Sequence, residues 1–224
     1  MAITGDETKK LVEDFRKQRE SLAQQKFHQI IGWSEMDFDA LMNDFEDKVV
    51  MVAYSESFLL NPGRVPFLMI FPPPNERQLK DRLAHLGFSE AFNQVQIKLS
   101  KIDDVEYYGK HPYMIFDVDP GHLIKNARYS AMILQRMKPI RRRLNFFEAV
   151  SMAPFLNSRP DMKIGFQIVV TGSRYINEEI SPAIDFAFSK ANPVINHFNL
   201  DNISARIGVP SCCEYTTYKP PTSY

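Results

Sequence analysis

Two carboxylates separated by one residue form the pattern in this sequence that most readily supports chemistry. Asp117 and Asp119 stand in the stretch Asp-Val-Asp-Pro-Gly, and His122 follows closely. On a strand, residues i and i+2 point to one face, so these carboxylates could share a proton or, with His122, bind a divalent metal. An EF-hand loop is excluded, because it needs glycine at His122 and glutamate at Arg128. The alternative is a strand that ends in a polar turn, since Asp-Pro-Gly is typical of turns.

Three arginine motifs predict a different kind of site, one that binds an anion. Arg64 follows a Pro-Gly turn, Arg143 precedes a helix that begins with Asn145, and Arg174 ends a Thr-Gly-Ser-Arg turn. Cations at a helix N-terminus oppose the helix macrodipole, whereas an anion there is stabilised by guanidinium and backbone N–H groups together. Arginine also grips phosphate or carboxylate in a bidentate manner that lysine cannot reproduce. The predicted anion-binding residues are Arg64, Arg141, Arg142, Arg143, Ser173 and Arg174.

Charges are segregated along the chain although the net charge is zero. Residues 34–47 carry six acidic and no basic residues, whereas residues 125–143 carry seven basic and no acidic residues. In one interpretation the acidic segment faces the basic segment, or each is a solvated face. In the other, the basic segment is an anion site, with Glu148 or the acidic segment as competing sources of countercharge. Zero net charge provides no global field that would draw the protein to nucleic acid or to an anionic membrane.

No remaining motif dictates a reaction. Ser173 lies in Thr-Gly-Ser-Arg, which lacks the glycine spacing of a nucleophile elbow, and the sequence contains neither a P-loop nor an HExxH zinc motif. The sequence therefore favours a non-catalytic binding or interaction protein with a small anionic ligand and no cofactor. The alternative is an enzyme that uses a carboxylate site at Asp117 and Asp119, with or without metal assistance. Whether the chain is an enzyme stays open at this stage.

Compartment and partners follow from simple features of the sequence. The N-terminal stretch is charged throughout, so it does not resemble a signal peptide, and no apolar run is long enough to span a bilayer. Cys212 and Cys213 are adjacent, and a disulfide between neighbours is strained, which favours two free thiols in a reducing cytoplasm. The aromatic residues are not interleaved with the arginines as a single-strand nucleic-acid platform requires. We therefore expect a cytoplasmic protein that has neither a membrane nor a nucleic acid as partner.

The elements that must position these residues predict an α+β fold, in which a mixed β-sheet packs with helices. Residues 1–48 are predicted to form an N-terminal helical segment, residues 49–213 an α/β core domain, and residues 214–224 a mobile tail. In the helical segment, a capping box at Thr4 and Glu7 opens the first helix and Ser34 caps the second. The interrupted apolar stripe of the first helix predicts a homodimer contact. That stripe comprises Leu11, Phe15 and Leu22.

The core domain shows strand and helix patterns in alternation, but not as regular βαβ units. A short strand is predicted at Val49 to Ala53, and another where Val95, Ile97 and Leu99 alternate with polar residues. A single sheet is predicted to contain the strands around Phe67, Tyr113, Ile168 and Phe186. Helices are predicted to begin near Asn75 and Asn145, the second with a capping box to Glu148, and a third to span Asn126 to Met137.

The stretch from Pro62 to Cys212 resembles a bacterial family of unknown function with many actinobacterial members. The resemblance rests on a set of short motifs: Pro62 to Phe67, Pro112-Tyr113, Asp117 to Gly121, Arg143 to Asn145, Glu148-Ala149, Thr171 to Arg174, Pro182-Ala183 and Gly208 to Cys212. The region before Ser211 departs from the ending rich in tryptophan, glycine and histidine that those members carry. The resemblance implies a shared fold and carries no activity with it.

Overall fold

The structure is a computed structural model, and it describes most of the chain. The described residues are 5–54, 63–73, 76–88, 101–104, 111–137, 140–152, 164–176, 178–185, 193–202, 204 and 206–213. The chain divides into two compact units, Met1–Pro62 and Gly63–Tyr224, here called the helical unit and the mixed unit. Helices and strands occur together in the mixed unit, which confirms the predicted α+β class. The division falls at residue 62, whereas the sequence placed it at residue 48.

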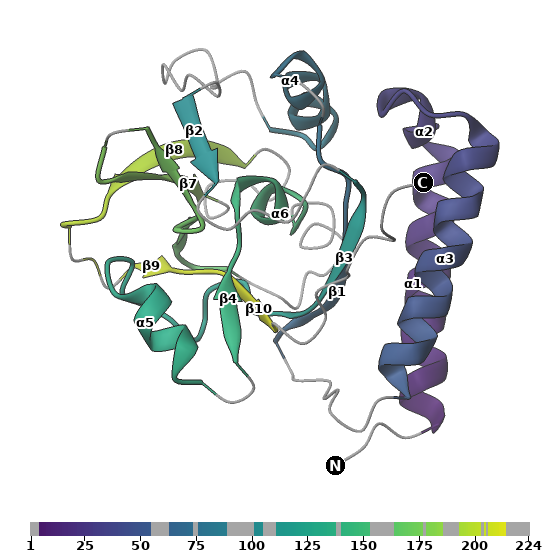
Figure 1. The fold of residues 1–224 in the computed structure, drawn as a ribbon, viewed down its shortest axis with the longest axis horizontal. Coiled ribbons are helices and arrows are strands. Elements are labelled where there is room, and N and C mark those ends of the chain that lie inside the picture. Colours follow the sequence, from purple (N-terminus) through teal and green to yellow (C-terminus); the bar gives the residue numbers. More distant parts are fainter. Residues whose placement is uncertain are drawn as a thin grey trace. The chain divides into compact units, whose positions relative to one another are not determined.

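The helical unit consists of α1 (Gly5–Gln24), α2 (Phe27–Ile30) and α3 (Glu35–Ala53) (Figure 1). α1 packs along α3. Lys26 adopts a positive φ of 51° at the N-cap of α2, which separates that short helix from α1. Ser34 caps α3, because its side chain accepts a hydrogen bond from the Asp37 backbone N–H. The predicted cap at Thr4 lies outside the described residues.

The predicted strand at Val49 to Ala53 is wrong, because α3 continues through these residues to Ala53. The β-branched valines favour a strand locally. However, Phe45, Val49 and Ala53 follow one another at intervals of four and are all buried. They therefore extend the buried face that begins at Phe38 and Met42. A continuous apolar face outweighs the weak strand preference of single residues.

The homodimer prediction gains no support from the helical unit. Leu11 and Phe15 are 2% and 0% exposed, so two of the three residues predicted to face a partner are covered within the chain, and Leu22 is half-buried. Arg16 and Arg19 of α1 pair instead with carboxylates of α3: Arg16 with Glu46 at 2.6 Å, and Arg19 with Asp39 at 3.1 Å. Residues of the acidic segment 34–47 are thus paired with arginines of α1, which belongs to the same unit.

Three helices and ten strands are assigned among the described residues of the mixed unit. The helices are α4 (Glu76–His85), α5 (Ser130–Gln135) and α6 (Phe146–Val150). The strands are β1 (Val65–Ile70), β2 (Ile102–Asp104), β3 (Tyr113–Val118), β4 (Arg141–Arg143), β5 (Gln167–Val169), β6 (Ser173–Tyr175), β7 (Ile180–Asp185), β8 (Val194–Asn199), β9 (Ile207–Gly208) and β10 (Ser211–Cys213). No described helix is long and apolar enough to cross a membrane.

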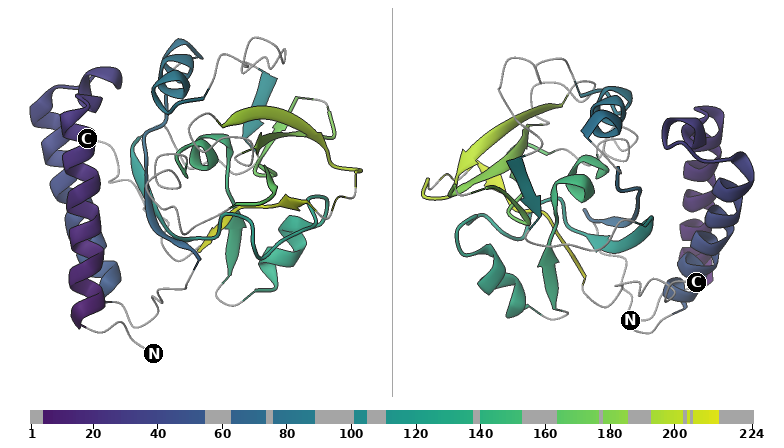
Figure 2. Two further views of the ribbon diagram at one scale, coloured as in Figure 1. Left: turned by 180° about the vertical axis from the view of Figure 1, so that it is seen from behind. Right: turned by 45° about the horizontal axis from the view of Figure 1, so that its top comes forward.

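The strands form several small sheets, so the predicted single sheet is wrong. β1 pairs with β3 antiparallel, β4 pairs with β10, and β2 pairs with β6. The largest described sheet has the order β8-β7-β5-β9, and in it β7 lies beside β8 as Figure 2 shows. Phe67 and Tyr113 therefore share one sheet, while Ile168 belongs to another. Residues 95–99 and Phe186 lie outside the described residues.

Apolar side chains from these separate sheets meet in one core. The core joins residues of β1 and β3 with residues of α4, α6, β5 and β7, including Ile70, Leu83, Phe146, Ile168 and Ile184. α6 begins at the predicted capping box, in which the Asn145 side chain and the Glu148 side chain bond reciprocally. α5 is shorter than the predicted helix from Asn126 to Met137.

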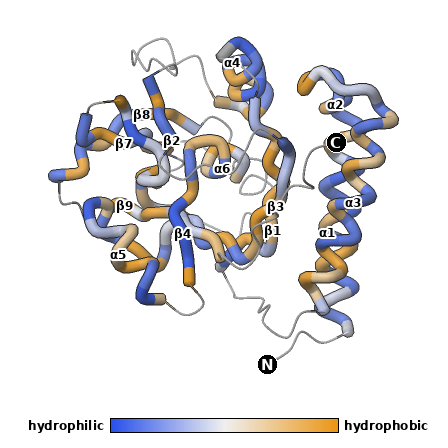
Figure 3. The backbone as a smooth tube through the Cα atoms, viewed as in Figure 1, coloured by the Kyte–Doolittle hydropathy of each residue, from blue (hydrophilic) through white to orange (hydrophobic). Residues whose placement is uncertain are grey.

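β4 stands out within the mixed unit, because it is hydrophilic and buried at once. It consists of three consecutive arginines, which Figure 3 colours as hydrophilic, and all three residues are buried. Burying charge is costly unless each charge is paired and hydrogen-bonded. The partners of these arginines therefore define the candidate functional site.

Candidate functional site

The end of β3 brings Asp117 and Asp119 beside two other strands. Asp119 exchanges backbone hydrogen bonds with Ser211 of β10, at 2.7 and 3.0 Å. β10 in turn pairs with β4, so Ser211 lies opposite Arg143 and Cys213 opposite Arg141. Segments separated by about seventy residues in the sequence thus meet at one point of the unit. Strand pairing, rather than any local motif, assembles the site.

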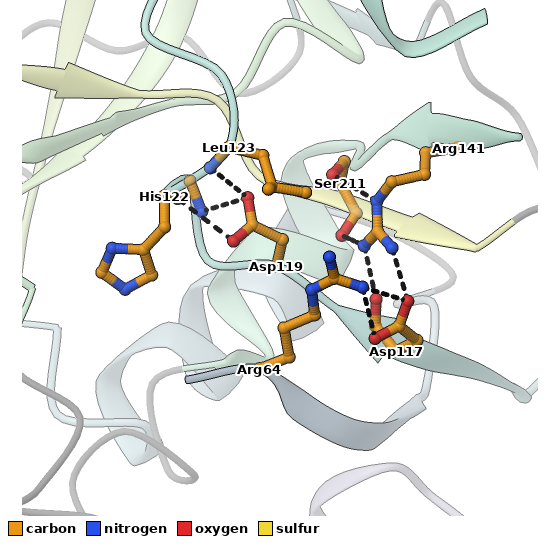
Figure 4. A network of polar contacts seen from close by, with 8 residues as sticks. Arg64, Asp117, Asp119, His122, Leu123, Arg141 and Ser211 are labelled. Atoms are coloured by element: carbon orange, nitrogen blue, oxygen red, sulfur yellow. Dashed lines mark hydrogen bonds and ion pairs between the residues drawn. The ribbon is translucent and has the colours of Figure 1, made fainter. Parts of the chain in front are cut away.

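Asp117 is the centre of the first charge cluster, which comprises Arg64, Asp117 and Arg141 (Figure 4). Arg64 donates from Nη1 to both carboxylate oxygens, at 2.9 and 2.6 Å. Arg141 donates from Nη1 to Asp117 Oδ2 at 2.5 Å. Asp117 adopts a positive φ of 48°, an uncommon conformation for a residue other than glycine. Such strain persists only where the surroundings impose it, and it concentrates at functional sites.

The two arginines of this cluster differ in their exposure and in their remaining hydrogen bonds. The Arg141 side chain is 2% exposed, and it also donates to the Ser211 hydroxyl and to the backbone carbonyls of Asp117 and Ser211. The Arg64 side chain is 21% exposed. Among the described residues, the recorded bonds of Arg64 use Nη1 alone and leave Nη2 and Nε open. Arg141 therefore holds Asp117 in place, while Arg64 has two nitrogens for which no bond to a described residue is recorded.

The Asp119 carboxylate binds the backbone of the loop that follows β3. Its carboxylate accepts backbone N–H groups from Gly121, His122 and Leu123, at 3.2, 3.2 and 3.0 Å. This is the turn chemistry that the sequence offered as the alternative to a catalytic carboxylate. The His122 ring points away from Asp119 in Figure 4 and packs edge-on against Phe166. Both carboxylates are therefore engaged by donors from the protein.

The metal prediction for Asp117, Asp119 and His122 gains no support from this arrangement. Among the residues that the structure describes, no group of three histidine, cysteine, aspartate or glutamate side chains could hold a metal ion. An acid or base must also have a lone pair or proton available to a substrate. The arginines on Asp117 and the backbone amides on Asp119 occupy those positions, so the geometry does not favour the alternative of a carboxylate enzyme.

A second charge cluster lies at the start of α6 and comprises Tyr113, Arg142 and Glu148. Arg142 binds Glu148 in a bidentate manner, at 2.8 and 2.7 Å. Tyr113 donates its hydroxyl to Glu148 Oε1 at 2.8 Å, and the Asn145 backbone N–H donates to Oε2 at 2.9 Å. The Arg142 and Glu148 side chains are 5% and 0% exposed. Burial, followed by the nearby Glu148 charge, raises the pKa of Tyr113.

Ser173 fixes the other side of α6. Its hydroxyl donates to Asp104 Oδ1 and accepts the Phe146 backbone N–H at 2.7 Å. Burial raises the pKa of Asp104 to about 6, against the opposing effect of the Ser173 hydrogen bond. Ser173 is fully buried, so its hydroxyl bonds to Asp104 and Phe146 and does not face a ligand.

The six residues predicted to bind an anion are thus divided among different places. Arg64 and Arg141 share the first cluster, Arg142 belongs to the second, and Arg143 is buried on β4. Arg174 lies on β6, its side chain is 36% exposed, and its nearest recorded carboxylate is that of Glu179 at 3.8 Å. The basic segment 125–143 finds its recorded countercharges in the mixed unit, on the carboxylates Asp117, Glu148 and Asp201.

Sequence reasoning missed Ser211, Asp104 and Tyr113 as members of these clusters. Ser211 reaches Arg141 because β10 pairs with β4, and Asp104 reaches Ser173 because β2 pairs with β6. Short strands of three residues carry almost no periodic signal, so neither pairing could be found from the sequence. Glu148 was foreseeable as a countercharge, because the capping box placed it beside the arginines.

Cys212 and Cys213 are free thiols on β10. Cys212 is buried, and this burial raises the pKa of its thiol to about 12. A thiol that stays protonated is a poor nucleophile and a poor metal ligand. The buried cysteine therefore packs within the core rather than contributing to a reactive site.

Comparison with known proteins assigns no function to this arrangement. No family model matches the chain. No curated protein and no solved structure matches it either. The argument for function therefore depends on the two charge clusters alone.

Proposed function

We propose that the mixed unit is a non-catalytic binding unit that takes up a small anion, a carboxylate or phosphate group, through Arg64. The observation that supports this proposal is the unused edge of the Arg64 guanidinium. Asp117 fixes the group through Nη1, while Nη2 and Nε have no recorded partner among the described residues. Two adjacent N–H groups on one guanidinium edge match the two oxygens of a carboxylate or phosphate.

The charge of the first cluster supports the same proposal. Arg64 and Arg141 together carry two positive charges, and Asp117 supplies one negative charge. An excess positive charge in a partly desolvated place is costly, and an anion beside Arg64 would offset it. Arg141 acts as a positioning residue, because its own N–H groups bind Asp117 and Ser211.

Thermal unfolding of the full chain tests the proposal. Phosphate or sulfate should raise the melting temperature more than chloride does at equal ionic strength. The stabilisation expected from mass action is about 2.7 kcal/mol at a hundredfold excess of ligand over its dissociation constant. Arg64→Ala should abolish this difference between anions, and Arg64→Lys should retain only part of it, because lysine lacks the bidentate edge.

A matched control distinguishes a site from general ion effects. Arg16 is an ion-paired arginine of the helical unit, with a side chain that is 65% exposed. Arg16→Ala should leave the difference between phosphate and chloride unchanged. Equal stabilisation by phosphate in the wild-type protein and in Arg64→Ala would remove Arg64 from the proposed function.

A further inference from the structure

Arg82 of α4 carries a positive charge that is buried in the mixed unit. The residue is 7% exposed. Its neighbours on the helix, Leu79 and Leu83, are buried in the same apolar core as Ile70 of β1. Arg82 therefore borders a region of low dielectric, where a charge is costly unless an opposite charge lies beside it.

The recorded hydrogen bonds of Arg82 supply no such charge. Its Nη1 donates to the Phe71 backbone carbonyl, which is a neutral acceptor. Among the described residues, the buried Nε–H has no hydrogen-bond partner, and no carboxylate is recorded as an ion-pair partner of the guanidinium. By contrast, Arg141 and Arg142 are as deeply buried and pair with carboxylates at 2.5 and 2.7 Å. Arg82 thus differs from these arginines in its missing countercharge.

The pKa of Arg82 agrees with this geometry. Burial lowers the pKa of the guanidinium to about 10, whereas a carboxylate close by would raise it. The group still keeps its proton at neutral pH, so the protein does not escape the cost by releasing that proton. An anion that accepts the Nε–H bond would offset the charge and satisfy the buried donor together.

We propose that Arg82 binds one chloride ion, which accepts the hydrogen bond of its Nε–H group. A monatomic anion needs the least room beside a residue that is 7% exposed, whereas a polyatomic anion would displace more of the surrounding side chains. The bound ion would serve stability, because it binds the folded chain and lacks its site in the unfolded one. This proposal does not depend on the anion site proposed at Arg64.

Thermal unfolding of the full chain tests the proposal when gluconate replaces chloride at constant ionic strength in a buffer without phosphate. Gluconate is a large anion that a buried site should exclude. Above the dissociation constant, each tenfold increase in chloride should raise the melting temperature of the wild type by about 4 °C. Arg82→Met should lose this response. In gluconate it should melt at or above the wild type, because an apolar side chain replaces a buried unpaired charge.

Two control variants separate Arg82 from other cations. Arg77→Met removes an exposed arginine from the same helix and should keep the response to chloride. Arg64→Ala should keep it too while losing the preference for phosphate, so failure at one site leaves the other intact. A crystal of the wild type grown with bromide provides a readout without any variant. Its anomalous scattering should place a bromide ion within hydrogen-bond distance of Arg82 Nε.

Three outcomes would overturn the proposal. One is a response to chloride that is the same in Arg82→Met as in the wild type. A second is an Arg82→Met variant that melts below the wild type by the same amount in chloride and in gluconate, which would show that the chain itself supplies the countercharge. The third is a bromide crystal with no anomalous signal at Arg82.

Discussion

The mixed unit contains two arginine–carboxylate clusters that use the same pairing chemistry but differ in exposure. In the second cluster, Arg142 and Glu148 are 5% and 0% exposed, and Glu148 accepts four hydrogen bonds from three residues. In the first cluster, Arg64 is 21% exposed and donates through Nη1 only. The comparison teaches that exposure, rather than the presence of an arginine, separates the structural pair from the arginine that we propose binds an anion.

The largest difference between the clusters should appear in stability. Glu148→Ala leaves the Arg142 charge buried without its carboxylate, and breaking such a pair costs about 3 to 5 kcal/mol. Arg64→Ala leaves Asp117 bound to Arg141, so its loss should stay near 1 kcal/mol. Urea unfolding of both variants measures the two free energies of unfolding. Equal losses in the two variants would end the distinction between the clusters.

A second test adds a methyl group to the backbone at Gly172, beside the second cluster. A Cβ at Gly172 would lie 2.2 Å from the Leu144 carbonyl oxygen and 2.9 Å from the Asn145 nitrogen, so the start of α6 would have to shift. Gly172→Ala should destabilise the protein by about 3 kcal/mol, the upper range for overpacking. Gly165→Ala is the matched control, since nothing lies within 4 Å of its Cβ, and urea unfolding should show little loss.

The pH dependence of stability tests whether Asp104, which accepts a hydrogen bond from Ser173, is buried in the folded protein. The folded pKa of Asp104 is raised from 3.8 to about 6, chiefly by burial. A carboxyl group with a raised pKa favours the folded state at low pH, and that stability is lost as the pH rises through the folded pKa. Asp104→Asn cannot ionise, so it should gain about 2 kcal/mol over the wild type between about pH 4 and pH 7. Urea unfolding across this range measures the gain, and a constant difference between the two proteins would contradict this reading.

The sequence predicted the parts of the fold that have long or strictly patterned elements. β3 forms at Tyr113, where a strand was predicted, and Ser34 and Asn145 cap helices as expected. It predicted a strand where residues 49–53 are helical, because the valines favour a strand locally although they extend the buried face of α3. The sequence also combined strands into one sheet, since pairing among short strands depends on distant contacts that no local pattern contains.

The candidate site was predictable in its components but not in its arrangement. Arg64 and Asp117 were both singled out, yet as members of different sites, one for an anion and one for a metal. Their pairing depends on the register in which Val65 lies opposite Val118, which places the residue before β1 beside the end of β3. Alternation alone leaves strand register open, so the sequence could not show that Asp117 orients Arg64.

The smallest loss of stability is expected when the Ser211 hydroxyl, which accepts a hydrogen bond from Arg141, is removed. Ser211→Ala removes the acceptor of the Arg141 Nε–H, which lies 3.0 Å away in a buried place. Leaving a buried donor without its acceptor costs about 1 to 3 kcal/mol, and the other bonds of Arg141 keep the loss at the lower end. The same variant should also weaken the stabilisation by phosphate, because Arg141 positions Asp117 and thereby Arg64. A melt with and without phosphate checks both effects, and unchanged stabilisation by phosphate would remove the positioning role.

We propose that Arg64 binds an anion and that Arg141 does not. Nuclear magnetic resonance tests this difference most directly, by following the Nε–H resonances of both arginines while phosphate is added at constant ionic strength. Resonances are assigned by their disappearance in Arg64→Ala and Arg141→Ala. The account predicts a saturable shift of the Arg64 Nε–H resonance, while that of Arg141, whose Nε already donates to Ser211, moves little. A saturable shift at Arg141 with none at Arg64, or no saturable shift at either, would contradict the claim that Arg64 binds the anion.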